Sequence, residues 1–306
     1  MNAAPAKAVV EEVALELGIN PAFVEKDWYV VQLIREITAV DELWAQVIFS
    51  GGTALSKAHR LIQRFSEDID FRLILPIEAQ QSKNQQRKAL SGIRDRLYGL
   101  LTEEFPKQEV GVKSRDANRY FSFELDYPSV VTPSTALRPH ILIEFSATTL
   151  SLPPLTCSVS SFIAELTKTS PEITAIVCLD PVENAVDKMS ALIWRVPDRV
   201  RQPIDDDPDL VRHIHDLAAL QPHAISHPEF RQLTIEMIGQ DDGRSDKITG
   251  WSVPQKLEHL MEILTTDREY PAEYTRFVQG MSYAMGGVPD YEEALGKLRM
   301  LVDYLI

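Results

Sequence analysis

Cysteine and long apolar runs are both scarce in this sequence. Its 306 residues include only Cys157 and Cys178, which lie far apart and fit neither a disulfide framework nor a metal-ligand spacing. No stretch stays apolar long enough to span a bilayer, and Glu11 and Glu12 interrupt the start of the chain before a signal-peptide core could form. We therefore expect a cytoplasmic protein in a reducing compartment, with no membrane partner.

The sequence also has few basic residues relative to its acidic ones. The chain has 31 Lys and Arg residues against 45 Asp and Glu residues, a formal net charge of −14. Long-range electrostatics of this sign repel nucleic acid, so a nucleic-acid substrate would have to bind a local basic patch. The best candidate is the stretch 83–96, which carries five cations, although we favour a solvated helix face as its explanation.

Internal repeats, low-complexity tracts and flexible Gly/Ser linkers are missing too. The composition, 44% hydrophobic and 25% charged, is that of a globular protein with room for two cores. Strand-like patterns occur only before residue 180, and helical periodicity alone follows it. We expect an α+β (mixed α/β) domain over 1–180 and a helical domain over 181–306.

A strand, a glycine turn and a helix follow one another near residue 50. Residues 46–49 are strand-like, Gly51 and Gly52 break the strand, and helical spacing resumes over 53–63. Backbone N–H groups at such a turn can approach a phosphate, and the helix dipole favours its charge. The nucleotide-binding candidates here are Gly51, Gly52, Thr53, Ser56 and Lys57.

Two features limit that interpretation. Lys57 could equally be a solvated surface lysine. The turn lacks the Gly-Lys-Ser/Thr ending of a P-loop and the G-x-G-x-x-G of a dinucleotide fold, so both of those families are disfavoured.

The stretch 68–75 alternates polar and apolar residues, which predicts a half-buried strand. Period-two geometry then puts the carboxylates of Asp68 and Asp70 on one face, close enough to share a divalent cation through oxygen ligands. Such a pair suits Mg²⁺ with a bound nucleoside triphosphate. Asp-x-Asp is common, however, and a solvent-exposed strand face that simply carries acids is the alternative.

A third carboxylate, Glu144, interrupts an apolar strand predicted over 140–146. Beside a metal-binding pair, a third acid can share the metal or help to deprotonate an attacking hydroxyl. The alternative is that Glu144 lies on the open face of an edge strand.

The runs FSGGTALSK (49–57) and RFSEDIDF (64–71) resemble the AbiEii/AbiGii-type nucleotidyltransferase toxins, a family that includes the MenT toxins. The similarity extends to 23–28, 181–192 and 212–217, and so covers roughly residues 20 to 220. It implies a polymerase-β-like nucleotidyltransferase core with a mixed sheet and an α-helical second lobe. It also implies the toxin of a toxin–antitoxin or phage-defence pair, with the tRNA 3′ end as acceptor and a cognate antitoxin encoded nearby.

The same resemblance implies a catalytic set: a Ser/Thr and an Asp two residues apart, a lysine and a distant aspartate. In this chain these become Ser66, Asp68, Lys188 and Asp216, with Asp70 completing the metal pair. The sequence departs from the pattern at residue 215, where histidine stands in place of the tyrosine common among relatives.

Helical spacing independently places Lys188 and Arg195 on one face, where they could offer two cations to a triphosphate. Asp216 could hold either cation or touch the nucleotide. A salt bridge between the two lobes is the alternative for Asp216.

These observations favour a Mg²⁺-dependent enzyme that transfers a nucleoside monophosphate from an NTP through in-line attack of a hydroxyl on the α-phosphate. Two alternatives stay open. One is the same chemistry on a protein or a small molecule, and the other is a non-catalytic NTP-binding module regulated by a partner.

Overall fold

The computed structural model describes residues 3–40, 43–80, 82–106, 108–201, 206–284 and 286–306. The chain divides into two compact units. The first contains Met1–Arg60 and Phe65–Leu179, and the second contains Leu61–Arg64 and Asp180–Ile306. Each unit is described by itself.

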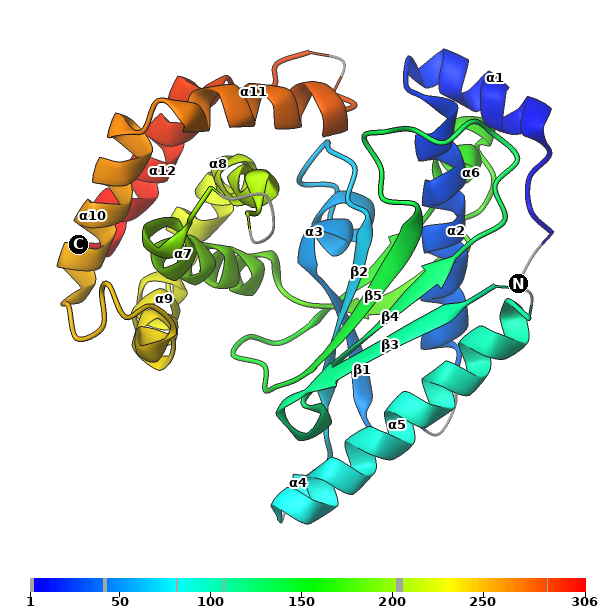
Figure 1. The fold of residues 1–306 in the computed structure, drawn as a ribbon, viewed down its shortest axis with the longest axis horizontal. Coiled ribbons are helices and arrows are strands. Elements are labelled where there is room, and N and C mark those ends of the chain that lie inside the picture. Colours follow the sequence, from blue (N-terminus) through cyan, green and yellow to red (C-terminus); the bar gives the residue numbers. More distant parts are fainter. Residues whose placement is uncertain (1–2, 41–42, 81, 107, 202–205, 285) are drawn as a thin grey trace. The chain divides into compact units, whose positions relative to one another are not determined.

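The first unit is built on a seven-stranded mixed sheet with the strand order β3-β4-β5-β2-β1-β7-β6 (Figure 1). β2 pairs antiparallel with β1 and parallel with β5, and β1 pairs parallel with β7. This mixed sheet confirms the α+β class expected from the sequence. The strands are β1 (Gln46–Ser50), β2 (Asp68–Ile74), β3 (Val110–Arg115), β4 (Tyr120–Asp126), β5 (His140–Ala147), β6 (Leu155–Val159) and β7 (Ile173–Cys178).

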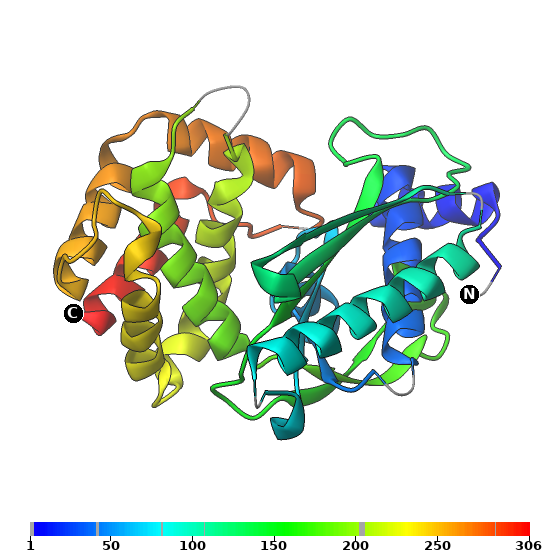
Figure 2. The same ribbon diagram turned by 60° about the horizontal axis from the view of Figure 1, so that its bottom comes forward.

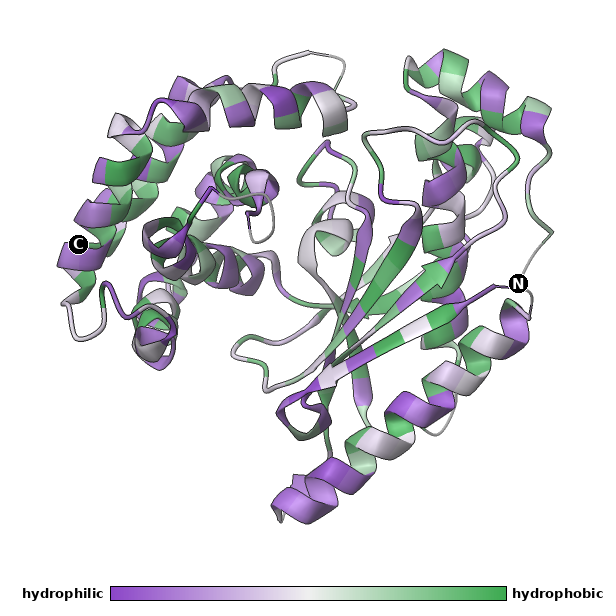
Figure 3. Ribbon diagram, in the orientation of Figure 1, coloured by the Kyte–Doolittle hydropathy of each residue, from purple (hydrophilic) through white to green (hydrophobic). Residues whose placement is uncertain are grey.

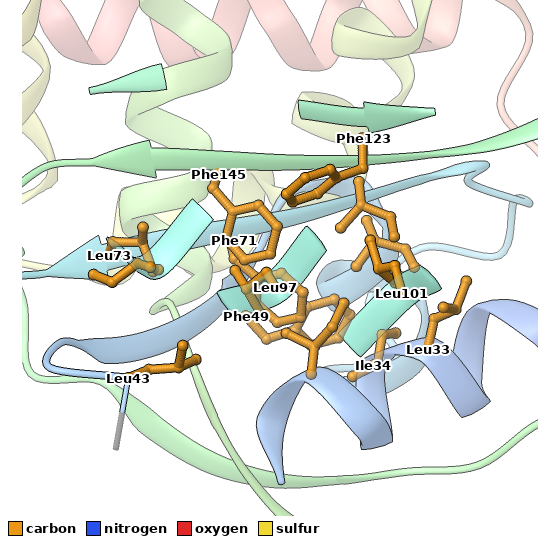
Figure 4. Close-up of a cluster of buried hydrophobic side chains, with 14 of the residues drawn as sticks. Leu33, Ile34, Leu43, Phe49, Phe71, Leu73, Leu97, Leu101, Phe123 and Phe145 are labelled. Carbon is orange, nitrogen blue, oxygen red and sulfur yellow. The ribbon is translucent and has the colours of Figure 1, made fainter. Parts of the chain in front are cut away.

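Helices α2 (Pro21–Thr38) and α5 (Lys83–Glu104) cover one face of this sheet (Figures 1 and 2). Figure 4 shows their leucine and isoleucine side chains packed against Phe49, Phe71 and Phe145 of the central strands. The rings of Phe71 and Phe145 stack with centroids 5.3 Å apart, a geometry that adds about 0.5–1.5 kcal/mol to the burial itself. Because side chains alternate along β2, Asp68 and Asp70 lie on the opposite face from this core.

Helix α2 begins where the sequence provides a cap and a proline. The Asn20 side chain accepts a hydrogen bond from the backbone N–H of Ala22 at 2.9 Å, and Pro21 occupies the first turn. The helix is buried around most of its circumference, including the charged residues Glu25, Lys26 and Asp27. The remaining helices of this unit are α1 (Lys7–Leu17), α3 (Gly51–Thr53) with its π-helical continuation η1 (Ala54–Ala58), α4 (Ile77–Gln80) and α6 (Phe162–Thr167).

The second unit is helical in all of its longer elements. Helix α7 (Pro181–Asp198) begins at Pro181 with Asp180 as its cap, and it packs against α8, α9 and α10. Helix α8 also packs against α12. The elements after α7 are η3 (Pro208–Val211), α8 (Arg212–Ser226), α9 (Phe230–Gln240), η4 (Asp242–Arg244), α10 (Val253–Thr266), α11 (Glu269–Met281) and α12 (Tyr291–Leu305).

Several boundaries differ from the sequence-based expectation. The helix expected over 53–63 ends at Ala58, because Arg60 adopts a positive φ of 56° that a helix cannot continue through. The sequence also predicts a long polar helix over about 79–104, and in the structure α5 starts only after a Ser82 cap. Sequence patterns did not predict β3, β6 and α6. β3 is an edge strand with four exposed residues in a row, so it lacks the alternation that marks a half-buried strand.

The basic stretch 83–96 forms most of α5. Its apolar side chains face the core, while Lys83, Arg87 and Lys88 are exposed. Figure 3 shows the beginning of α5 mostly in hydrophilic colours. The helix covers the sheet face opposite Asp68 and Asp70, as expected of a solvated helix face. Among the described residues, no helix combines the length and the apolar character needed to cross a membrane.

Candidate active site

Three carboxylates meet on the open face of the central strands. Asp70 of β2 is paired in register with Ser50 of β1 on one side and with Glu144 of β5 on the other. Residues paired across neighbouring strands share a face at a spacing of about 5 Å. The structure therefore brings together Asp68, Asp70 and Glu144, the three acids that the sequence marks as metal ligands. Their oxygen donors are of the type that Mg²⁺ prefers.

Gly51 is the residue of the glycine turn that contacts this acidic face. Its φ is +74°, and a Cβ atom added there would lie 1.9 Å from Oδ2 of Asp70. Both the backbone conformation and the close approach exclude any side chain at this position. The turn therefore packs its main chain directly against the carboxylate of Asp70.

Two hydroxyl groups fasten the turn to β2. Ser50 Oγ donates a hydrogen bond to the backbone oxygen of Asp70 at 3.2 Å, and Thr53 Oγ1 donates to the backbone oxygen of Asp68. Gly52, Thr53 and Ser56 are buried. These bonds fix the strand that carries the acids, and a direct role of Gly52, Thr53 and Ser56 in nucleotide binding stays a prediction.

Lys57 is buried, so the alternative of a solvated surface lysine is wrong. Its Nζ lies 2.7 Å from Oδ1 of Asp27 and 3.8 Å from the ring centroid of Phe162. Burial raises the pKa of Asp27 to about 6, although the charge of Lys57 opposes the shift. A contact between Lys57 and a triphosphate would require the ammonium to turn away from Asp27, and this role stays a prediction.

Ser66 is half-buried in the segment that precedes β2. Together with Thr53, Lys57 and Asp27 it lines a small cavity with room for about one water molecule. Its place two residues before Asp68 follows from the sequence, while the catalytic role that the resemblance implies stays a prediction.

The cation that contacts Asp68 was not predicted from the sequence. Arg138 places its Nη1 2.8 Å from Oδ1 of Asp68, and its backbone N–H donates to Oε2 of Glu67 at 2.7 Å. The ammonium of Lys26 completes the network, 2.5 Å from Oε2 of Glu67 and 2.9 Å from the backbone oxygen of Arg138. Burial lowers the pKa of Lys26, with Glu67 opposing the shift. A guanidinium group therefore neutralises Asp68 in this structure.

Glu144 also has a partner that the sequence did not indicate. The phenol of Tyr120 donates a hydrogen bond to Oε1 of Glu144. Burial and this bond together raise the pKa of Tyr120 to about 12, so the phenol keeps its proton at neutral pH. Because Tyr120 comes from the neighbouring strand β4, the sheet itself orients the third carboxylate.

Asp216 is the centre of a buried ion cluster within the second unit. It accepts hydrogen bonds from Nε and Nη2 of Arg64, each at 2.7 Å, and Nζ of Lys188 lies 2.8 Å from its Oδ2. Although burial raises the pKa of Asp216, the charges of Arg64 and Lys188 hold it well below its usual value. Of the two cations proposed as its partner, Lys188 contacts Asp216.

Arg195 instead contacts the carboxylate of Asp207, with 2.5 Å between Nη2 and Oδ2, and it lies beside His213. Burial lowers the pKa of His213 well below its usual value, and the neighbouring charges of Arg212 and Lys188 reinforce that shift. The role of Arg195 in nucleotide binding stays a prediction.

A mixed sheet that carries an Asp-x-Asp strand, a third acid on the adjacent strand and a glycine turn against the pair defines a nucleotidyltransferase-type site. Comparison with protein families supports this class, since the model described as "Nucleotidyl transferase AbiEii toxin, Type IV TA system" matches residues 34–297. The chain belongs to this family of nucleotidyltransferase toxins of toxin–antitoxin systems. Membership implies an NTP substrate and an antitoxin partner.

One solved structure shows the same fold. MenT4, the nucleotidyltransferase toxin Rv2826c from Mycobacterium tuberculosis H37Rv, has 16% sequence identity and a TM-score of 0.54, with 98% of this chain and 99% of that chain covered. JHP933 from Helicobacter pylori has 14% identity and a TM-score of 0.47, with 92% of each chain covered. A comparison with functionally curated proteins returns no match.

Proposed function

We propose that this chain is a Mg²⁺-dependent nucleotidyltransferase that transfers a nucleoside monophosphate from an NTP to a hydroxyl group, with the tRNA 3′ end as acceptor. The observation that supports this most strongly is the placement of Asp68, Asp70 and Glu144 on one sheet face, with Gly51 packed against Asp70. Three oxygen ligands on adjacent strands form a rigid set that needs little rearrangement to hold a cation.

Asp68 and Asp70 would hold Mg²⁺, which supplies charge neutralisation at the triphosphate. The protein contributes the positions of these groups. Ser50 and Thr53 fix the backbone of β2, Gly51 limits the movement of Asp70, and Arg138 would compete with the metal for Oδ1 of Asp68. We assign Glu144, oriented by Tyr120, to help the metal or to accept a proton from the attacking hydroxyl.

The assignment of Lys188 and Asp216 to the reaction is a proposal drawn from the family resemblance. Lys188 would neutralise the triphosphate, and Asp216 would position Lys188. The second unit supports the positioning role, because Asp216 holds both Lys188 and Arg64 at hydrogen-bond distance. Exchange of Lys188 for Gln should then reduce transfer while Asp216 keeps its contacts with Arg64.

Label transfer tests the proposed function and its acceptor together. Purified protein is incubated with Mg²⁺, total bacterial RNA and each NTP, labelled with ³²P at the α- or the γ-phosphate, beside an Asp68→Ala variant. Nucleotidyl transfer moves the α-label and not the γ-label into product. The proposal predicts α-labelled, tRNA-sized product that RNase removes and protease does not.

Other outcomes have defined meanings. Label that protease removes moves the acceptor from RNA to protein and contradicts the tRNA assignment. Transfer that is unchanged in Asp68→Ala contradicts the metal role of the pair. If no acceptor is labelled with any NTP, while NTP still binds, then the non-catalytic NTP-binding alternative replaces the proposal.

A further inference from the structure

Three soft donor groups lie together in the first unit, away from the carboxylates. They are His59, which follows η1, Cys157 of β6 and Cys178 of β7, and one ligand atom from each lies within 4.8 Å of the others. Cys157 is paired with Ile176, so Cys178 is its diagonal neighbour on the same face of the sheet. Sequence spacing could not reveal this, because the pairing of β6 with β7 creates the proximity.

The cluster occupies a different sheet face from the acids. Cys178 is paired with Phe49, and Phe49 is paired with Phe71, whose ring lies in the core under α2 and α5. Paired residues share a face, and neighbouring residues along β2 alternate. The thiol of Cys178 therefore points away from the face that carries Asp70.

The imidazole of His59 is oriented for ligation. Its Nε2 lies 2.9 Å from the backbone oxygen of Leu179, which can only accept a hydrogen bond, so Nε2 carries the proton. The unprotonated Nδ1 then faces Sγ of Cys157 at 3.8 Å. A ring N–H held by a backbone carbonyl, with the other nitrogen aimed at thiols, is the arrangement that fixes the tautomer of a metal-binding histidine.

The separations suit a tetrahedral ion. With Zn–S bonds of about 2.3 Å and Zn–N bonds of about 2.0–2.1 Å, donor atoms around zinc lie about 3.5–3.8 Å apart. The His59–Cys157 distance already meets this value, and the other donor pairs would approach each other by no more than about 1.0–1.3 Å. Two sulfur donors and one imidazole select zinc over Mg²⁺, which prefers oxygen.

We propose that His59, Cys157 and Cys178 bind one Zn²⁺, with water in the fourth position. Burial raises the pKa of the Cys178 thiol, and zinc binding at this residue would release its proton. The ion would join the end of the Gly51–Ala58 segment to β6 and β7. Because the start of that segment packs on Asp70, we assign the zinc a structural role in holding the glycine turn.

Metal content and cobalt spectroscopy test this site without any assay of transfer. The untagged protein, expressed with zinc in the medium and dialysed, should contain about one zinc per chain. Co²⁺ added to the metal-free protein should produce the near-ultraviolet absorption of thiolate-to-cobalt charge transfer. The variants Cys157→Ser, Cys178→Ala and His59→Ala should each weaken Co²⁺ binding by more than the 10- to 100-fold cost of losing an outer-shell partner. Exchange of the exposed His223 for Ala is the matched control and should change nothing.

Half-buried Cys157 provides the variant least prone to misfolding, and circular dichroism checks each fold. Three results would overturn the proposal: no charge-transfer band in the wild-type protein, a band of equal strength in a folded Cys157→Ser variant, or alkylation and mass analysis showing the two cysteines joined as a disulfide in the native protein. None of these results bears on nucleotidyl transfer at Asp68 and Asp70.

Discussion

At the scale of single residues, Gly51 controls how the turn meets the acids. A Cβ atom there would overlap Oδ2 of Asp70, and its φ of +74° strains any other residue. We expect Gly51→Ala to displace the Asp70 carboxylate, to lower label transfer at least about 100-fold and to cost about 1–3 kcal/mol of unfolding free energy. Urea denaturation and the transfer assay measure the two effects.

Gly92 of α5 provides the matched control. It has helical geometry and open space around its Cα, so Gly92→Ala should leave transfer unchanged and add about 0.4–1 kcal/mol of stability. Equal behaviour of the two variants would show that Gly51 has no special contact with Asp70.

The raised pKa of Asp27 predicts how the stability of the folded protein depends on pH. Its pKa in the folded protein is about 6, raised by burial from an ordinary 3.8, so between these values the folded state holds a proton that the unfolded state has lost. The contribution of this group to stability therefore falls as the pH rises from 4 to 7, by up to about 3 kcal/mol. For most paired carboxylates the folded-state pKa is lowered instead, and their contribution to stability rises with pH.

Unfolding free energies at pH 4.5, 5.5 and 7 for the wild type and Asp27→Asn measure this contribution. The difference, wild type minus variant, should decrease as the pH rises. A difference that grows with pH would mean that the Lys57 ion pair outweighs the burial of Asp27.

At the scale of elements, the segment before β5 supplies a cation to the acidic strand β2. Arg138 and a metal compete for Asp68, and the pair is partly exposed, which limits its strength to about 1 kcal/mol. We expect Arg138→Ala to lower the Mg²⁺ concentration for half-maximal transfer by up to about fivefold. For Arg138→Lys this Mg²⁺ concentration should stay close to the wild-type value. A higher Mg²⁺ requirement in Arg138→Ala would contradict a competition between Arg138 and the metal for Asp68.

Local pattern was sufficient to predict the elements that carry the acids. Strands β2 and β5 were predictable because each has one buried face and one open face. The end of β1 was predictable from the glycine pair that follows it. The fold class was also predictable. The partners of these acids were not, because the contacts of Arg138 with Asp68 and of Tyr120 with Glu144 depend on strand pairing and loop closure. Lys57 also shows that a cation near a glycine turn can pair with a buried acid.

At the scale of the whole molecule, each of the two units has a buried interior of its own. Both units have buried apolar side chains, and the helical unit adds the buried cluster of Asp216 with Arg64 and Lys188. We expect Asp216→Asn to cost about 3–5 kcal/mol of unfolding free energy, because it leaves two buried cations without their counter-charge.

Chemical denaturation measures this cost, with the exposed Asp303→Asn of α12 as control. A change of less than about 1 kcal/mol in Asp216→Asn would show that the cluster does not stabilise the fold, and the role of Asp216 would then have to be confined to the reaction.

We propose that the sheet face holding Asp68, Asp70 and Glu144 carries out nucleotidyl transfer. The most direct measurement is the rate of α-³²P transfer to RNA by the wild type, by Asp70→Asn, and by Asp126→Asn, which removes an exposed carboxylate from the same sheet. We expect a loss of about 10³-fold for Asp70→Asn, equivalent to several kcal/mol of transition-state stabilisation, and a wild-type rate for Asp126→Asn. Transfer by a folded Asp70→Asn protein at the wild-type rate would contradict the proposal.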